Sequence, residues 1–171
     1  MKNYEQVPPA EDAAEPVPLL TLKGEDCGFQ HQFSVGETYP FHTHTFYEFF
    51  LISKGKGIHR INEASILLSE GSFVFVRPSD RHGYDFLNQY DLELINVSFL
   101  PSIFDKICGL LGCPQSFFTG SPLSLHTELA EPLLSDIRDK MLQVGRLDPG
   151  AGRRLYLNSV LPFFLYQFCP G

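Results

Sequence analysis

The 171-residue sequence has few features of membrane or nucleic-acid-binding proteins. No apolar run approaches the roughly 20 residues of a membrane-spanning helix, and the first residues lack the apolar segment of a signal peptide. Lysine and arginine together number 13 against 20 acidic residues, which gives a net charge of −7. Because contacts to phosphate need clustered cations, we do not expect this chain itself to bind DNA. We expect a cytoplasmic protein without a membrane partner.

Cysteine is also sparse. The four cysteines, Cys27, Cys108, Cys113 and Cys169, are scattered, and a reducing compartment disfavours disulfides. Cys108 and Cys113 lack the second close pair that a structural zinc site needs. We expect all four cysteines to behave as small buried apolar residues. No serine, cysteine or lysine is placed as an obvious catalytic nucleophile.

The composition changes twice along the chain, although the length fits one domain with a sizeable core. Residues 1–18 hold four prolines among acidic residues and alanines, which favours an extended or disordered arm. In residues 19–100, short β-prone runs alternate with turn signals, which predicts a sandwich or barrel. The predicted strands are 19–23, 28–35, 46–53, 56–62, 65–68, 73–76 and 91–99.

Residues 101–171 form a predicted helical appendix. Apolar residues recur at helical spacing over 101–111, where Gly112 should end the helix, and over 131–144, where Gly145 should end it.

A further helix is predicted over 149–168, because Asp148 and Pro149 suit a helix start. Pro162 should kink this helix or split it in two. Its apolar face is predicted to hold Leu155, Val160, Leu161, Phe164, Leu165 and Phe168. The helices over 131–145 and 149–168 carry more leucine and phenylalanine than covering a small barrel requires. We therefore expect them to form a homodimer interface, the alternative being that they pack on the barrel exterior.

Three histidines and one glutamate are spaced so that they can converge. His42, His44 and Glu48 share one parity, so on an extended strand their side chains point to the same face. A second strand-like run ends at the turn 78–80 and delivers His82. Neutral imidazoles and a carboxylate suit zinc, iron, manganese, nickel or copper, so these four residues are candidate metal ligands. The alternative is that they hydrogen-bond a polar effector without a metal.

This pattern resembles the two motifs of the cupin family. The first motif is matched position for position by Gly36, His42, His44, Glu48 and Gly55. The second keeps its spacing from Gly71 to His82 but departs inside it: Pro78 stands one place late, Ser79-Asp80 replaces the glycine turn, and Phe86 occupies the asparagine position. The resemblance implies a double-stranded β-helix, or jelly roll, over 19–100 that encloses a ligand cavity.

Other residues near the four are candidate ligand contacts. Phe46 and Phe50 share the inward parity of the motif glutamate and would suit a sugar ring, although such residues are often only core. His59 lies on the next predicted strand, where alternation does not settle its direction. Arg77 and Arg81 flank the turn before His82 and could reach an anionic group, although arginines at turns are usually solvated.

The order of arm, barrel and paired helices resembles the N-terminal effector-binding and dimerisation portion of AraC-type transcriptional regulators. The stretches His42–Ser53, Gly71–Pro78 and Leu94–Phe99 look like those of sugar-responsive members, including regulators of chitobiose utilisation. The resemblance covers about residues 20–168. It implies a small carbohydrate effector and DNA binding only through a C-terminal domain that this sequence does not contain. We expect an excised sensing domain or a shortened gene product.

Two functions therefore remain open. In the first, the chain is a sensor and not an enzyme. In the second, it is a metal-dependent cupin enzyme, such as a dioxygenase or a sugar isomerase, with the four candidate ligands holding the metal. An enzyme barrel does not need the helix over 149–168 whereas a dimeric regulator does, so we favour the sensor.

Overall fold

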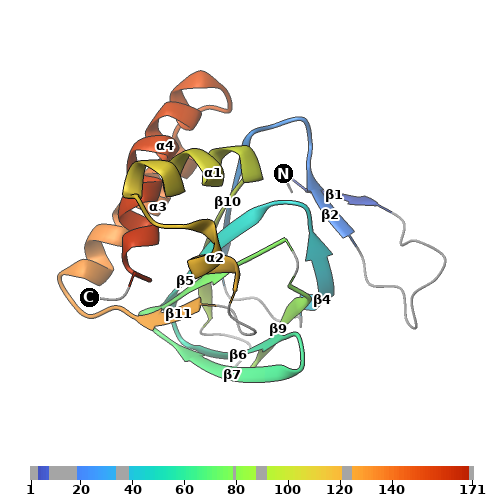
Figure 1. The fold of residues 1–171 in the computed structure, drawn as a ribbon. Helices are drawn as coiled ribbons and strands as arrows, with labels where there is room; N and C mark the ends of the chain where they lie inside the picture. Colours follow the sequence, from blue (N-terminus) through green and yellow to red (C-terminus); the bar gives the residue numbers. More distant parts are fainter. Residues whose placement is uncertain are drawn as a thin grey trace.

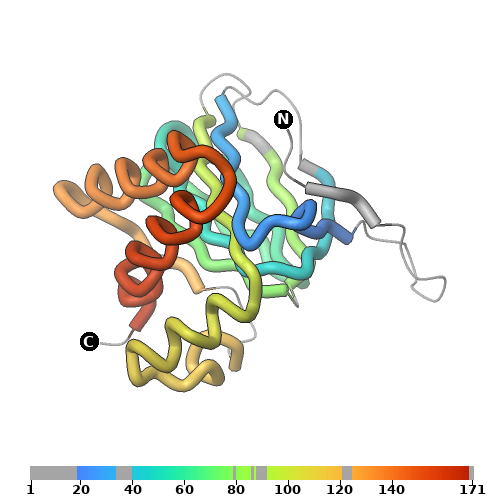
Figure 2. The backbone as a smooth tube through the Cα atoms, turned by 90° about the horizontal axis from the view of Figure 1, so that it is seen from above, coloured from blue at the N-terminus to red at the C-terminus, as the bar shows by residue number. Residues whose placement is uncertain are grey.

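Two facing β-sheets and a layer of helices make up the protein (Figures 1 and 2). The computed structural model describes residues 4–7, 19–33, 39–78, 80–87, 92–120 and 125–169. The helices cover the outer side of one sheet, which is therefore buried on both faces. The predicted cupin jelly roll, mainly β with helices after it, is confirmed.

The open-faced sheet, on which no helix of the described residues packs, has six described strands in the order β1-β2-β4-β9-β6-β7. These strands are β1 (Tyr4–Val7), β2 (Leu19–Leu22), β4 (Tyr39–His44), β9 (His82–Phe86), β6 (Lys56–Ile61) and β7 (Ala64–Ser69). Strand β9 runs antiparallel to both β4 and β6, and its first residue, His82, pairs with His42 of β4. The histidines of the two cupin motifs are thus neighbours in one sheet.

The helix-covered sheet has five strands in the order β11-β8-β5-β10-β3. These are β11 (Leu125–Glu128), β8 (Ser72–Val76), β5 (Tyr47–Lys54), β10 (Glu93–Phe99) and β3 (Cys27–Phe33). Its central strand β5 is buried from Tyr47 to Ser53 because both faces are covered. Phe49 and Leu51 pack toward the helices, whereas Phe50 and Ile52 pack inside the barrel.

The part of the chain that the structure describes also holds four helices: α1 (Pro101–Leu111), α2 (Gln115–Thr119), α3 (Leu133–Arg146) and α4 (Ala151–Tyr166). Phe164 of α4 and Phe168 just after it reach the outer face of the helix-covered sheet, with ring centroids 5.8 and 5.9 Å from that of Phe49. Burying one phenylalanine contributes about 1.5–3 kcal/mol, so this aromatic layer holds the helices firmly on the barrel. None of the helices in the described residues is long and apolar enough to cross a membrane.

The seven predicted strands correspond to β2, β3, β5, β6, β7, β8 and β10, with ends displaced by at most a few residues. Four further strands, β1, β4, β9 and β11, were not among the seven; β4 contains His42 and His44, whose shared parity with Glu48 assumed an extended strand. β1 lies in the predicted arm and pairs with β2, while β11 is short and β9 contains Gly83 and Asp85, residues that strands disfavour. Residues 8–18 of the predicted arm and the motif glycine Gly36 lie outside the described residues.

The helix predictions need three corrections. α1 ends where expected, with Gly112 in the left-handed region at φ 63°. α4, however, begins at Ala151 and continues through Pro162, so the predicted split is wrong; buried Leu161 and Phe164 anchor it on both sides of the proline. Leu155, predicted on the apolar face of this helix, is 73% exposed.

The third correction concerns Gly145, which lies inside α3 rather than ending it. A Cβ atom at this position would overlap the ring of Phe29 on β3. The glycine therefore allows α3 to pack closely on the helix-covered sheet. The same need for space explains motif glycine Gly71, whose φ is +94° and where a Cβ would meet the Leu129 carbonyl oxygen at 2.5 Å.

We predict that Gly145→Ala destabilises the protein although alanine is the better helix former. Overpacking against Phe29 should lower the free energy of unfolding by about 1–3 kcal/mol, measured by urea denaturation. Gly109→Ala in α1 is the matched control, because nothing lies within 4 Å of its new methyl group. The control should be neutral or stabilising by up to about 1 kcal/mol. Equal shifts of the two variants would contradict close packing at Gly145.

Candidate functional site

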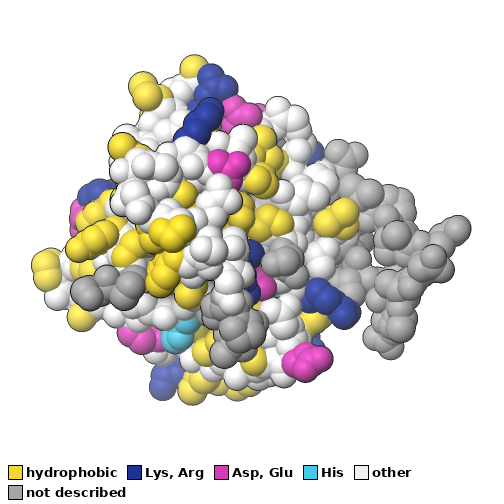
Figure 3. All heavy atoms as spheres, in the orientation of Figure 1, with side chains coloured by type: hydrophobic (Ala, Val, Ile, Leu, Met, Phe, Trp, Pro, Cys, Tyr) yellow, Lys and Arg dark blue, Asp and Glu magenta, His cyan; other side chains and the backbone are white. Residues whose placement is uncertain are grey.

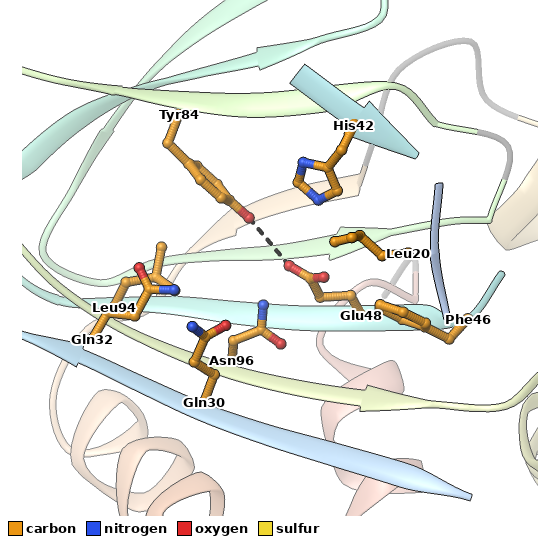
Figure 4. A pocket seen from close by; sticks show the side chains of 9 residues that line it. All are labelled: Leu20, Gln30, Gln32, His42, Phe46, Glu48, Tyr84, Leu94 and Asn96. Atoms are coloured by element: carbon orange, nitrogen blue, oxygen red, sulfur yellow. Dashed lines mark hydrogen bonds between the residues drawn. The ribbon is translucent and has the colours of Figure 1, made fainter. Parts of the chain in front are cut away.

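The four candidate ligands lie inside the barrel but come from both sheets. β4 ends at His44 and β5 begins at Tyr47, with a bend between them at residues 45–46. His42 and Glu48 therefore do not lie on the single extended strand that the parity argument assumed. The bend carries the chain from the open-faced sheet to the helix-covered sheet, so Glu48 faces His42 across the barrel (Figure 4). The side chains of His42, His44 and Glu48 do converge, as their shared parity predicted, but they do so from two facing strands, β4 and β5.

Three of the four candidates form a compact group. His44, Glu48 and His82 each offer one ligand atom, and these atoms lie within 4.8 Å of one another. The His44 Nε2 atom is 3.7 Å from Glu48 Oε2. All three side chains are buried. His42 stands beside this group, with its ring centroid 4.3 Å from that of His82 and 6.1 Å from that of His44.

Backbone carbonyls orient two of the histidines. His44 Nδ1 donates a hydrogen bond to the Phe46 carbonyl oxygen at 2.6 Å, and His42 Nδ1 donates one to the Pro40 carbonyl oxygen at 3.0 Å. A neutral imidazole has a single N–H, so the Nε2 atom of His44 carries a lone pair. This is the arrangement that metal-binding histidines use, in which one ring nitrogen is held by a carbonyl and the other faces the ion.

The fourth histidine of the barrel interior, His59, supports His82. Its Nε2 atom lies 3.2 Å from His82 Nδ1 in a buried hydrogen bond. Within the described residues, the Nε2 atoms of both His44 and His82 are buried without a hydrogen-bond partner. Each such orphaned polar atom costs about 1–3 kcal/mol. A metal ion bound by His44, Glu48 and His82 would satisfy both atoms, so the residues present fit a divalent transition metal.

Burial shifts the pKa values of the ionisable groups in the site. Burial raises the pKa of Glu48 to about 8, although hydrogen bonds from Tyr84 and Asn96 oppose the shift. Burial, reinforced by neighbouring His42, lowers the pKa of His44 to about 3, and burial lowers that of His82 well below its ordinary value. At neutral pH the group is therefore uncharged, with neutral histidines and a protonated carboxyl group, unless a cation is bound.

A small pocket adjoins this group (Figure 4). Its volume is ≈ 10 Å³, which is about the space that a single water molecule needs. Figure 4 shows the amide side chains of β3 and β10 pointing toward Glu48, and the Tyr84 hydroxyl donates a hydrogen bond to Glu48 Oε1 at 3.1 Å. The lining residues are Leu20, Gln30, Gln32, His42, Phe46, Glu48, Tyr84, Leu94 and Asn96.

The amides of this pocket were not predicted as site residues. Gln30 and Gln32 of β3 and Asn96 of β10 stand at inward positions of strands whose other faces pack toward α3. Polar residues at inward strand positions are the signal that could have identified them, because buried polar groups need a partner or a ligand. Tyr84 was missed because β9 itself was missed.

The other candidate contacts lie at different distances from the pocket. Phe46 lines it and stacks on His44 with centroids 4.3 Å apart. Phe50 is buried in the barrel core, edge-on to Tyr84, and does not line this pocket. His59 points inward and is stacked on Tyr84.

Arg77 requires a correction. It lies just after β8, where its guanidinium pairs with Asp80 at 2.8 Å and reaches the Thr119 carbonyl oxygen of α2 at 3.4 Å. It therefore does not face the pocket. Arg81, the other arginine of the turn, is exposed and lies over the ring of Phe41.

The Asp80 carboxylate takes the place of the glycine turn in the second motif. It accepts hydrogen bonds from the Arg77 amide at 3.0 Å and from Asn62 Nδ2 at 3.1 Å. Asn62 adopts a positive φ of 51° and its side-chain oxygen accepts from the Arg81 amide at 3.0 Å. These bonds link Arg77, Asp80 and Arg81 to Asn62, and His82 still reaches the site in spite of the altered motif.

Comparison with known proteins agrees with this architecture. The family model described as AraC-like ligand binding domain matches residues 30–159. The HTH-type transcriptional activator RhaR of Klebsiella pneumoniae is 27% identical over 103 residues, which make up 60% of this chain and 36% of that protein. The chain thus matches only about a third of this relative's length.

Solved structures of ToxT from Vibrio cholerae have a similar fold. Apo ToxT K231A superposes with a TM-score of 0.65 at 12% identity, covering 84% of this chain and 56% of that one. Wild-type ToxT with a bound unsaturated fatty acid gives 0.57 at 14% identity, covering 83% and 52%. At such low identity the likeness concerns the fold alone. The family model, by contrast, matches well over half of the sequence and includes every residue of the site except Leu20, and the chain therefore belongs to the family of AraC-like ligand-binding domains.

Proposed function

We propose that this chain is the effector-sensing and dimerisation domain of a transcriptional regulator, whose DNA-binding part belongs to the longer protein. The proposal rests on the helix-covered sheet, because one face of this sheet lines the pocket and the other face contacts the helices. Glu48 and Asn96 face the pocket from one side of it, while Phe49 and Val97, the next residues along the same strands, pack toward the helices on the other. A ligand that moves β5 or β10 therefore acts on the helices directly. Such a role belongs in the cytoplasm.

We infer that the effector is a small uncharged polar molecule, in the first place a sugar. The pocket offers the amides of Gln30, Gln32 and Asn96 together with the Tyr84 hydroxyl, all of which can hydrogen-bond sugar hydroxyls. The Phe46 ring supplies an apolar surface. None of the described residues lining this pocket is a lysine or an arginine, which disfavours a carboxylate such as the fatty acid named for ToxT.

The size of the pocket supports a sensor that changes shape. A volume of ≈ 10 Å³ does not hold a sugar ring, so the effector must bind a second, more open conformation. A ligand that prefers one of two states shifts the population between them, and a ligand that binds both equally transmits nothing.

We further propose that His44, Glu48 and His82 bind a divalent transition metal, with His42 beside them as the fourth ligand. Zinc, iron, manganese, nickel and copper all suit these ligand types. When bound, such an ion would act as a Lewis acid that polarises or orients an oxygen atom of the effector. The same group supports the second candidate function, a metal-dependent cupin enzyme of the dioxygenase or sugar isomerase type.

The proposed homodimer uses the outward side of the helical layer. Figure 3 shows hydrophobic side chains gathered on the side of the molecule where the helices lie. Leu155 and Tyr166 of α4 are 73% and 64% exposed, and Leu110 of α1 is 75% exposed. Leu155 and Tyr166 are eleven residues apart, so they lie on one face of α4. Exposed apolar residues on one helix face are typical of a protein interface.

We predict that metal binding depends on the compact group. Elemental analysis of the untagged chain should find near one metal per chain, and the double variant His44→Ala/Glu48→Ala should lose it. His126→Ala, a change on the exposed face of β11, is the matched control and should keep the metal. No metal in the wild type after incubation with zinc, iron or manganese would remove the metal from this account and leave the four residues as effector contacts.

A second prediction concerns the effector. Neutral mono- and disaccharides, screened by thermal shift, should include one that raises the melting temperature, and Asn96→Ala and Gln30→Ala should each weaken its binding by roughly 2–10-fold through one lost hydrogen bond. Gln115→Ala, which removes a surface hydrogen bond of α2, should bind normally. Stabilisation by fatty acids and by no sugar would instead assign the pocket a ToxT-like ligand.

The dimer generates a third prediction. Leu155→Glu combined with Tyr166→Glu should convert a dimer into a folded monomer, because it places charges in an apolar interface while leaving the buried face of α4 intact. Light scattering measures the change. Leu67→Glu is the control, since Leu67 is 60% exposed on the edge strand β7, far from α4 in sequence and on the other sheet. A dimer that survives the α4 changes but not the β7 change uses a barrel face instead.

A further inference from the structure

His59 holds His82 in a way that no backbone group could. Its ring, on β6, is completely buried and lies edge-on to the ring of His82, with centroids 5.4 Å apart. His59 Nε2 is 3.2 Å from His82 Nδ1. In the part of the chain that the structure describes, this is the only hydrogen bond of the His82 ring, because His82 Nε2 is buried without a partner. The contact to His59 therefore decides which nitrogen of His82 carries the proton.

The supporting group of His82 differs in kind from that of His44. His44 Nδ1 faces the Phe46 carbonyl oxygen, and a carbonyl oxygen only accepts, so this ring must keep its proton on Nδ1. An imidazole nitrogen, in contrast, either donates or accepts. Both His59 and His82 are buried and neutral, so one proton lies between their facing nitrogens.

That proton has two places. If it belongs to His59 Nε2, then His82 carries its own proton on Nε2 and points an N–H at the compact group. If it belongs to His82 Nδ1, then His82 Nε2 carries a lone pair, which a metal ligand needs. His59 Nδ1 is buried without a partner among the described residues in both arrangements, so this atom does not favour either one. A bound cation accepts only the second.

We propose that His59 is a positioning residue for the metal, which accepts the Nδ1 proton of His82 and so leaves the His82 Nε2 lone pair to the ion. The inference rests on the metal site proposed above for His44, Glu48 and His82. Metal-binding histidines generally donate their second N–H to a fixed acceptor, which orients the ring and raises its basicity. In this barrel the acceptor is an imidazole that is not itself a member of the ligand group.

The ring of His59 is fixed by its own neighbours. It stacks on Tyr84, with centroids 5.3 Å apart and 21° between the ring planes, and it meets Phe50 edge-on at 5.0 Å. Tyr84 in turn donates its hydroxyl proton to Glu48 Oε1 at 3.1 Å (Figure 4). The side chains that support His82 and Glu48 thus lie against one another. This packing holds His59 Nε2 toward His82 whether or not an ion is bound.

The test is the zinc affinity of the complete chain, measured by competition with a chromophoric chelator. His59→Phe keeps a ring against Tyr84 but removes the acceptor, and it should weaken zinc binding by about 10–100-fold. His59→Gln, whose amide oxygen can accept the proton from His82, should recover most of this loss. Ile52→Val removes one methyl group from the apolar cluster inside the barrel and is the matched control, with zinc affinity like that of the wild type. Equal affinity in the wild type and His59→Phe would overturn the proposal.

NMR locates the proton directly. Long-range proton–nitrogen correlation spectra of the zinc-loaded wild type should show His82 protonated at Nδ1 and bound through Nε2. Binding through Nδ1 would overturn the proposal even if His59→Phe misfolds. The two levels of failure are distinct. A wild type that binds no zinc removes the metal site and this inference with it, whereas zinc binding that His59→Phe leaves unchanged removes only the role of His59.

Discussion

The burial of both faces of the helix-covered sheet is the constraint on which the rest of the structure depends. Along β5 and β10, side chains alternate between the barrel interior and the aromatic layer under the helices. A one-residue slip of register would place Glu48 among phenylalanines and Phe49 in the polar pocket. Burying the Glu48 carboxyl group among aromatic rings without a hydrogen-bond partner would cost free energy, and this cost fixes the register. The geometry of the site and the seating of the helices are therefore consequences of one pairing.

This constraint also explains the chemistry of the site. Glu48 is buried deeply enough to hold its proton at neutral pH, and His44 and His82 are buried deeply enough to stay neutral. Three buried imidazole nitrogens have no hydrogen-bond partner among the described residues, and two of them, His44 Nε2 and His82 Nε2, belong to the compact group. Such a group is poised for a cation or for a ligand rich in hydroxyls, because either replaces hydrogen bonds that the fold leaves unmade. The cavity beside it is too small for more than water until the strands move.

Much of this could be predicted from the sequence because it depends on local patterns. The spacing from His42 to Glu48 and from Gly71 to His82 identified the barrel and three residues that meet in it. Other features depend on contacts between distant segments. The amides of Gln30 and Asn96 come together only because β3 and β10 pair. Gly145 was predicted to end a helix, because the sequence alone does not show that Phe29 packs against this glycine. Arg77 was a candidate contact because it flanks the turn before His82, whereas its guanidinium pairs with Asp80 and reaches the Thr119 carbonyl oxygen of α2.

The central claim is that effector binding reaches the helices through the helix-covered sheet. Hydrogen–deuterium exchange, measured by mass spectrometry with and without a saturating sugar found in the screen, tests it most directly. The account predicts altered exchange in the pocket strands β5 and β10 and also in α3 and α4, which the sugar cannot touch. Changes confined to the pocket strands, with unaltered exchange in both helices, would contradict it.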